Sequence, residues 1–457
     1  MRRVKAGFVG FGEVNTPREI IERKCLDAKR RLEDMGVELV YTDPVSDDPQ
    51  GRDVQRACAD LKRECFDLLI VCVAGWIPSH AVISVISEFS HKPILLWGLA
   101  GYMEDGRLIT TADQAGTTAL RKVMEDMGYR FKFVYNTPSS PPRMDKVESF
   151  CKAARAASLL KHSKVGMMGF RDMNLYATLY DGVSLRGKIG PEIEVFEMLE
   201  IVQRMGKIEE KEVETVIEEI KKNWVFEKPA DGKILEKGAR FYLAIREKAK
   251  ERDYQAVSLI DVDGMKKLMN FPPAMILQLL ADRDGICTIP ENDALGAITQ
   301  LIIKYLTGQI GAYMEFYEFM EDRVLIGVPD YVPSEIVEGP VRVTVTSFGL
   351  FGEGVLNISK VKPGKVTLCR LSSTGDRYMM HVVTGRAVEP RRWEEAGWKP
   401  PAPQLPSLEV ILDVPVEEFA EKVLSQHYIM SYGDNTALLK DLCKLLDVEI
   451  IQQSIKY

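Results

Sequence analysis

The sequence contains no CxxC pair, although eight cysteines are spread along its 457 residues. Zinc ribbons and dithiol redox centres both need closely spaced cysteines, so neither kind of site is expected. Cys72, within the apolar run 69–73, has the surroundings of a buried and reduced thiol. The cysteines therefore indicate packing rather than chemistry.

Basic blocks and long apolar runs are also missing. The net charge of -7 is spread along the chain, which argues against a nucleic-acid partner. No apolar run is long enough to span a bilayer. The opening Met1-Arg2-Arg3-Val4-Lys5 leads directly into a strand-like run, unlike a secretory signal. We therefore expect a cytoplasmic protein that binds neither nucleic acid nor membrane.

A complete dinucleotide fingerprint is absent as well. Gly10-Phe11-Gly12-Glu13 follows the first strand-like run, but Asn15 stands where a third glycine would complete GxGxxG. No acidic residue ends the second strand in the usual place. We interpret these glycines as part of a tight turn.

Length and pattern predict an α/β protein of several domains. The chain is too long for one ordinary core, and its 46% hydrophobic and 28% charged residues are typical of globular proteins. Alternating strand-like and helix-like segments predict two Rossmann-like layered α/β domains, and alternating runs separated by Gly and Pro predict a β-rich C-terminal domain. The boundaries are 1–142, 143–330 and 331–457, with a Pro-rich loop at 399–406.

The pattern also predicts individual elements. Expected strands are 5–10, 37–42, 67–74, 93–97, 131–135, 164–170, 193–198, 256–260, 341–348, 365–371, 379–383 and 408–414. Expected helices are 17–35, 53–64, 144–160, 209–222, 234–250, 294–306, 416–424 and 436–446.

Two acidic segments stand in apolar surroundings. Ile289-Pro290-Glu291-Asn292-Asp293 and Tyr313-Met314-Glu315-Phe316-Tyr317 both place carboxylates where desolvation costs roughly several kcal/mol. Asp293 is expected to cap the helix 294–306. Glu291 then stands free in the loop, where α/β folds bind ligands. Such acids are retained for a cation, for proton transfer, or for both.

His427, in Ser425-Gln426-His427-Tyr428, could complete a metal site of two carboxylates and one imidazole. A lone histidine is more often structural than a ligand, so His427 carries little weight without the two acids. An organic substrate is often bound against an aromatic stacking surface. Trp76 and Tyr317 are candidates for substrate binding, and plain core positions are the alternative.

At these residues the chain resembles the L-fucose/L-arabinose isomerase superfamily over essentially its whole length. The segments around Glu291, Glu315 and His427 are similar to the family's metal-binding motifs and follow the same order. The segment Trp76-Ile77-Pro78-Ser79-His80 is similar to a first-domain loop that reaches a neighbouring subunit's active site. The order and spacing are more specific than any single motif.

The resemblance implies an aldose–ketose isomerase that acts on a pentose or 6-deoxyhexose through an enediol. Glu291, Glu315 and His427 would bind a divalent cation, usually Mn²⁺, and the two acids would also be the catalytic proton-transfer pair. The family forms homo-oligomers, commonly hexamers. Residues 323–330 lack the extra histidine of arabinose isomerases, while Glu315 stands where fucose isomerases have Asp. The chain therefore resembles a divergent member whose sugar is not fixed.

Two alternatives stay open. An epimerase would use the same metal and enediol chemistry on a different reaction. A non-catalytic sugar-binding or regulatory protein could use the same scaffold, because fold does not fix function.

Overall fold

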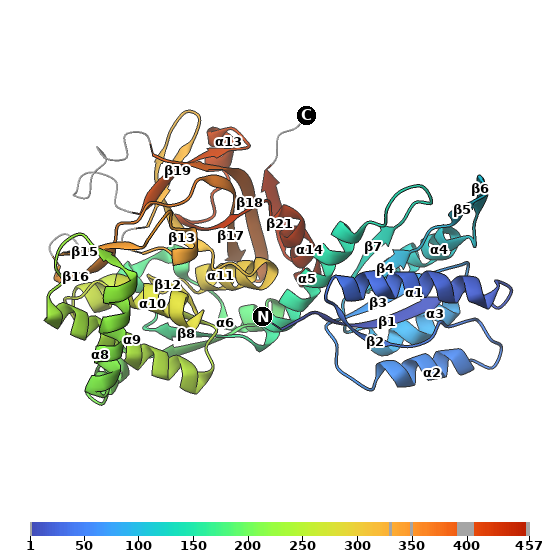
Figure 1. Cartoon of the computed structure of the whole chain (residues 1–457), viewed down its shortest axis with the longest axis horizontal. Coiled ribbons are helices and arrows are strands. Elements are labelled where there is room, and N and C mark those ends of the chain that lie inside the picture. The colour runs from blue at the N-terminus through green and yellow to red at the C-terminus, as the bar shows by residue number, and fades with distance from the viewer. Residues whose placement is uncertain (1, 329–330, 348–350, 391–405, 454–457) are drawn as a thin grey trace. The chain divides into compact units, whose positions relative to one another are not determined.

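The computed structural model describes residues 2–328, 331–347, 351–390 and 406–453 (Figure 1). Contacts divide the chain into two compact units. Unit 1 is Met1–Ser158 with Ala437–Leu446, and unit 2 is Leu159–Thr436 with Asp447–Tyr457. The finer division into three domains, at residues 142 and 330, stays a prediction. No described helix is long and apolar enough to cross a membrane.

Unit 1 is built on one parallel sheet with strand order β2-β1-β3-β4-β7. Helices pack beside this sheet, as expected for a doubly wound fold (Figure 1). The strands are β1 (Lys5–Phe11), β2 (Glu38–Tyr41), β3 (Leu68–Val73), β4 (Ile94–Gly98) and β7 (Phe131–Tyr135), with a small hairpin of β5 (Tyr102–Glu104) and β6 (Arg107–Ile109). The helices are α1 (Arg18–Asp34), α2 (Arg52–Leu61), α3 (Ser79–Ile86), α4 (Asp113–Asp126), α14 (Thr436–Leu446) and the start of α5 (Met144–His162).

Gly10 at the end of β1 and Gly12 just after it allow the close approach of α1. The buried face of α1 includes Ile21 and Cys25, four residues apart. A side chain at Gly10 would collide with the sulfur of Cys25, and one at Gly12 would collide with Ile21. Tight helix–strand packing therefore accounts for this motif without a bound nucleotide.

Unit 2 contains a second parallel sheet with strand order β12-β11-β8-β9. Its strands are β8 (Lys164–Met168), β9 (Glu192–Phe196), β11 (Ala256–Leu259) and β12 (Cys287–Ile289). The helices of this part are α6 (Gly182–Lys188), α7 (Met198–Met205), α8 (Glu210–Asn223), α9 (Gly232–Arg252), α10 (Ala274–Asp284) and α11 (Ala294–Thr307). The predicted α/β class is confirmed by these two parallel sheets.

A mostly antiparallel sheet forms the C-terminal part of unit 2. Its order is β17-β20-β13-β14-β19-β18-β21, and β17 also pairs with β18, so six of these strands close into a barrel. The strands are β13 (Ala312–Phe319), β14 (Val324–Gly327), β17 (Gly364–Thr374), β18 (Arg377–Val388), β19 (Ser407–Leu412), β20 (His427–Tyr432) and β21 (Glu449–Gln453). A smaller sheet joins β10 (Val225–Phe226), β15 (Arg342–Ser347) and β16 (Glu353–Asn357). The predicted β-rich C-terminal region is confirmed.

Helix α11 connects the two sheets of unit 2. It contacts β8, β11 and β12 of the parallel sheet and β17 and β20 of the barrel. Its side chains are therefore buried on nearly all sides, as expected for an apolar helix inside a protein. The loop before α11, which holds Glu291, thus lies where the two sheets meet.

The predicted element bounds agree with the structure to within a few residues in most cases. One helix is shorter than predicted, because α13 (Val416–Ala420) ends before residue 424. The expected loop at 399–406 lies outside the described residues except for Pro406, and Phe348 at the end of a predicted strand also lies outside them.

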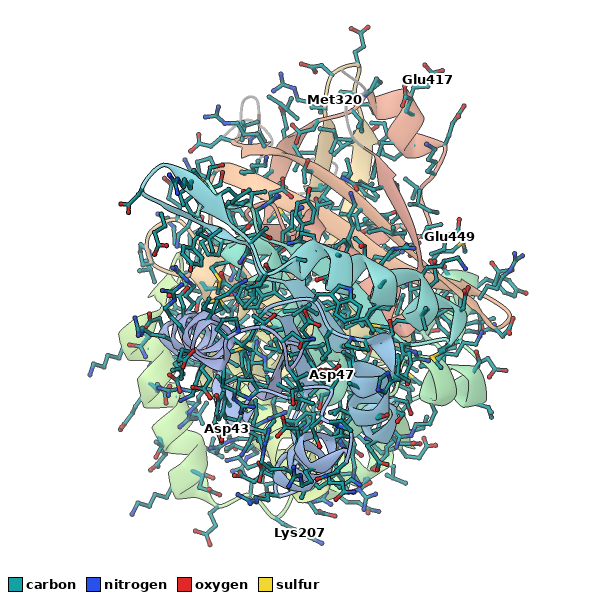
Figure 2. The ribbon with its side chains drawn as sticks, turned by 90° about the vertical axis from the view of Figure 1, so that its right-hand side faces the viewer. Asp43, Asp47, Lys207, Met320, Glu417 and Glu449 are labelled. Carbon is teal, nitrogen blue, oxygen red and sulfur yellow. The ribbon has the colours of Figure 1, made fainter. Side chains whose placement is uncertain are left out.

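Some charged side chains lie in connecting segments. Asp43 and Asp47 follow β2, and Lys207 lies between α7 and α8 (Figure 2).

Candidate active site

Three acidic residues follow three neighbouring strands of the second parallel sheet. Asp172 follows β8, Asp261 follows β11, and Glu291 follows β12. Because these strands are adjacent and parallel, their carboxyl ends meet at one edge of the sheet. Of these three acids, only Glu291 was predicted as a site residue. Asp261 was detectable as an acid directly after a predicted strand, whereas Asp172 stands in an irregular segment with no such signal.

The loop that carries Glu291 has an unusual backbone. Glu291 and the next residue, Asn292, have φ angles of 65° and 51°, in the left-handed region. Each such residue costs roughly 1–2 kcal/mol. Asn292 holds the loop in place, since its backbone N–H donates to Leu259 O at 3.1 Å and its side-chain amide donates to Met168 O at 2.8 Å. The turn thereby fixes Glu291 beside the ends of β8 and β11.

Glu291 is an acid in a negative and largely buried environment. Its side chain is only 12% exposed. Burial raises the pKa of Glu291 to about 9, and the negative charges of Asp261, Glu315 and Asp172 act in the same direction. Its Oε2 atom receives no hydrogen bond from the described part of the chain. A carboxyl group in this setting ionises readily only when a positive charge comes close.

The barrel supplies Glu315 and His427. They are register partners on the antiparallel strands β13 and β20. His427 Nδ1 lies 3.6 Å from Glu291 Oε2, and Glu315 is close enough for its charge to act on Glu291. The structure therefore brings the three predicted site residues into one region of unit 2.

Burial has opposite effects on the two barrel residues. It raises the pKa of Glu315, an effect that the positive charge of Lys266 partly opposes. It lowers the pKa of His427 to about 3, so the imidazole is neutral at physiological pH. The ring of His427 stacks on Tyr313, with centroids 4.3 Å apart. A neutral and firmly oriented imidazole has a lone pair available for a metal ion.

Asp293 has a structural role, as predicted. Its side chain caps α11 by accepting a hydrogen bond from Gly296 N at 2.8 Å. It also accepts from Tyr313 Oη at 2.9 Å and from both terminal nitrogens of Arg370 on β17. Arg370 holds the pKa of this buried carboxyl below its usual range. No local pattern marked Arg370, because this arginine is distant from Asp293 in the chain and stands in an ordinary β-rich run.

The donor chemistry of the three site residues suits a divalent cation. Two carboxylates and one neutral imidazole are ligands that Mn²⁺ and Mg²⁺ accept, and Oε2 of Glu291 has no hydrogen-bond donor in the part of the chain that the structure describes. Within the described residues, no three His, Cys, Asp or Glu side chains stand close enough together to form a metal site as they are placed. The ligand set of Glu291, Glu315 and His427 therefore stays a prediction.

The two aromatic candidates for substrate binding lie in different units. Trp76 follows β3 in unit 1 and is 40% exposed. Its backbone is fixed by hydrogen bonds to Glu13 and Thr111. Tyr317 is on β13 in unit 2, at a register shift, and its ring packs on Gly327 of β14. Substrate binding by either residue stays a prediction.

Comparison with known proteins points to sugar isomerases. No protein-family profile matches the chain. A sulfoquinovose isomerase of Priestia megaterium is 20% identical over 371 residues, which cover 80% of each chain. An L-arabinose isomerase of Shouchella clausii is 23% identical over 324 residues, covering 67% of this chain and 64% of that protein. A sulfoquinovose isomerase of Alkalicoccus urumqiensis is 18% identical over 368 residues.

These weak similarities support a divergent relationship of the chain to the sugar isomerases. The predicted resemblance is confirmed to this extent, and the relatives' names agree with the predicted aldose–ketose isomerase. The low identity agrees with the differences from the family pattern that the chain shows at and after Glu315.

Proposed function

We propose that this isomerase interconverts an aldose and a ketose, a pentose or 6-deoxyhexose, through an enediol, with a divalent cation bound by Glu291, Glu315 and His427. The observation that carries the proposal is the state of Glu291. Its carboxyl group is buried among Asp261, Glu315 and Asp172, beside a neutral imidazole, and one of its oxygens receives no hydrogen bond from any described residue. A bound cation would offset the repulsion between these acids and would stabilise the ionised form of Glu291.

The two acids would share the proton transfers. One carboxylate would take the proton from C2 of the sugar and return it to C1, and the other would take the proton of the C2 hydroxyl and give a proton to the C1 oxygen. His427, neutral because it is buried, would contribute its lone pair to the cation. When bound, the cation supplies Lewis-acid stabilisation of the negative charge that develops on the sugar oxygens at C1 and C2. Mn²⁺ is the proposed ion.

The sugar should be sought among the substrates that the relatives' names give. We propose a screen with and without added Mn²⁺ that includes sulfoquinovose, L-arabinose, other pentoses and 6-deoxyhexoses, read as direct aldose–ketose interconversion. We expect Glu315→Gln to lower kcat by about 10³-fold or more. Glu318→Gln is the matched control, because Glu318 is an exposed glutamate on the same strand. Equal loss in both variants would contradict a catalytic role for Glu315.

The same screen separates the alternatives. Isomerisation in deuterated water incorporates label at one carbon and yields a ketose, whereas an epimerase returns a stereoisomeric aldose or ketose. A sugar-binding protein would bind stoichiometrically without any conversion. Full activity after EDTA treatment would exclude the metal-dependent mechanism.

A homo-oligomer, with a hexamer as the expected size, is part of the proposal. Trp76 would then serve the active site of a neighbouring subunit. Light scattering of the purified protein gives the assembly directly. Trp76→Ala should raise KM while Mn²⁺ binding stays unchanged, and an unchanged KM would remove Trp76 from the site.

A further inference from the structure

A buried ion pair lies beside the candidate metal ligands and has no part in the proposed mechanism. Lys266 Nζ and Asp261 Oδ2 are 2.9 Å apart, and the two side chains are 2% and 3% exposed. Both residues belong to one short π-helical segment, Asp261–Lys266, that directly follows β11. Burying a lysine so completely is costly, so its charge must be offset by nearby acids.

Between them, the charges of Lys266 and Asp261 affect all three proposed ligands. The positive charge of Lys266 acts on Glu315 and opposes the effect of burial there. The negative charge of Asp261 acts on Glu291 and on His427. Lys266 is thus a fixed cation within an acidic cluster that includes groups from both the parallel sheet and the barrel. Arg370, a second cation near the cluster, is already held by Asp293 through two hydrogen bonds.

We propose that Lys266 sets the affinity of this site for divalent cations. The inference rests on the proposed function, since it concerns the same site. A fixed ammonium group repels an incoming divalent ion, while Asp261 attracts it, and the low dielectric of a buried site makes both effects strong. Lys266 thereby lowers the affinity for the cation and stabilises the acidic cluster when no cation is bound. Lys266 therefore acts through its charge and does not itself bind the cation.

The proposal predicts opposite effects for the two members of the pair. Lys266→Met should tighten Mn²⁺ binding by about tenfold or more, because one repulsive charge is removed. Asp261→Asn should weaken it by a similar factor. The double variant Lys266→Met/Asp261→Asn should return to within about threefold of the unmodified protein, since the net charge of the cluster is restored. Lys266→Arg keeps the charge and should leave the affinity nearly unchanged.

The experiment is calorimetric titration of the full chain with MnCl₂ after removal of metal by EDTA and dialysis. Lys267→Met is the matched control, because Lys267 is the next residue but is half exposed and pairs with Asp263. Its affinity should equal that of the unmodified protein. If Lys266→Met does not fold by circular dichroism, Asp261→Asn is compared with the double variant. These two differ only in the lysine charge, and the double variant should bind about tenfold more tightly.

The outcomes separate this inference from the proposed function. If the unmodified protein binds no Mn²⁺ at millimolar concentration, the proposed metal site is wrong and the inference falls with it. If Glu291→Gln abolishes binding while Lys266→Met changes it less than twofold, the metal site stands and the role of Lys266 is overturned. Weaker binding by Lys266→Met also overturns it. If the double variant binds as weakly as Asp261→Asn, Asp261 is itself a ligand and the charge argument fails.

Discussion

Arg370 and Asp293 form a buried two-bond ion pair that joins the barrel to the start of α11. Arg370 is 1% exposed and Asp293 is fully buried. Both terminal nitrogens of the guanidinium donate to the carboxylate, with Nη2 at 2.9 Å from Oδ1. Because α11 follows directly on the loop of Glu291, this pair fixes the barrel and its His427 relative to the parallel sheet and its Glu291. The site is therefore assembled by a contact that carries no catalytic group.

Arg370→Met should destabilise the protein strongly. The change leaves the Asp293 carboxylate buried without its cation, which typically costs about 3–5 kcal/mol. The midpoint of urea unfolding, followed by circular dichroism, measures the loss. Arg370→Met/Asp293→Asn should recover a large part of the stability, because no buried charge is left unpaired. Equal midpoints for the unmodified protein and the single variant would contradict this role of the pair.

Asn292→Ala should disturb the loop that holds Glu291. Alanine loses the hydrogen bond to Met168 O and must still adopt a left-handed φ, so we expect a loss of about 1–3 kcal/mol. Asn292→Gly loses the same hydrogen bond but tolerates that φ, and it should be the more stable of the two. Thermal unfolding of both variants gives the order. A glycine variant less stable than the alanine variant would argue against the backbone explanation.

The metal-free protein should lose stability as pH rises. The pKa of Glu291 is about 9 in the folded protein, above its ordinary value of 4.5, and that of Asp172 is about 7. At pH values between the ordinary pKa and the folded-state pKa of each acid, the folded protein binds more protons than the unfolded chain. The contribution of these acids to stability is therefore complete near pH 4 and is lost as pH rises towards 9. We expect a loss of at least about 1 kcal/mol between pH 5 and pH 9.

Glu291→Gln supplies the control for this pH dependence. Glutamine cannot ionise, so melting temperatures of the EDTA-treated variant should vary less with pH than those of the unmodified protein. The two curves should diverge most towards pH 9. Parallel curves would show that Glu291 does not titrate abnormally.

The cysteines should differ sharply in reactivity. Cys65 is exposed, whereas burial raises the pKa of Cys25, Cys151, Cys287 and Cys443 to about 12. A thiol-specific reagent at pH 8 should therefore label Cys65 quickly and these four only after unfolding. Mass spectrometry of peptides identifies the labelled residues. Cys65→Ser should remove most of the fast phase, and any remainder should map to the partly exposed Cys58; fast labelling of Cys25, Cys151, Cys287 or Cys443 would contradict the prediction.

Local sequence patterns predicted most of the elements. The strand at Phe131–Tyr135 and the helix at Thr436–Leu446 have the predicted bounds, and Asp293 caps α11 as expected. Periodicity and capping depend on residues a few positions apart, which a sequence displays directly. The helix expected at 416–424 ends early, at Ala420. The backbone N–H of Leu424 donates to the hydroxyl of Tyr428 on β20. This contact with the barrel replaces the hydrogen bond that a continued helix would form.

Local sequence patterns could not predict which residues contact the site residues. Glu315 and His427 face each other only because β13 and β20 pair in one register, and a shift of one residue would turn their side chains to opposite faces. Asp172 and Arg370 likewise interact with residues far away in the chain, and so does Lys266 through its charge on Glu315. Such pairings depend on how sheets and helices pack together, and no short stretch of sequence contains that information.

The amino-acid sequence by itself determined the alternation of strands and helices, the cap of α11 and the presence of acids in apolar surroundings, because each depends on neighbouring residues. Tertiary structure alone decided that these acids share one negative environment, that Lys266 is buried beside them, and that Arg370 neutralises Asp293. The reason is electrostatic: burial and distance set the charge of each group, and both are known only after distant segments have packed.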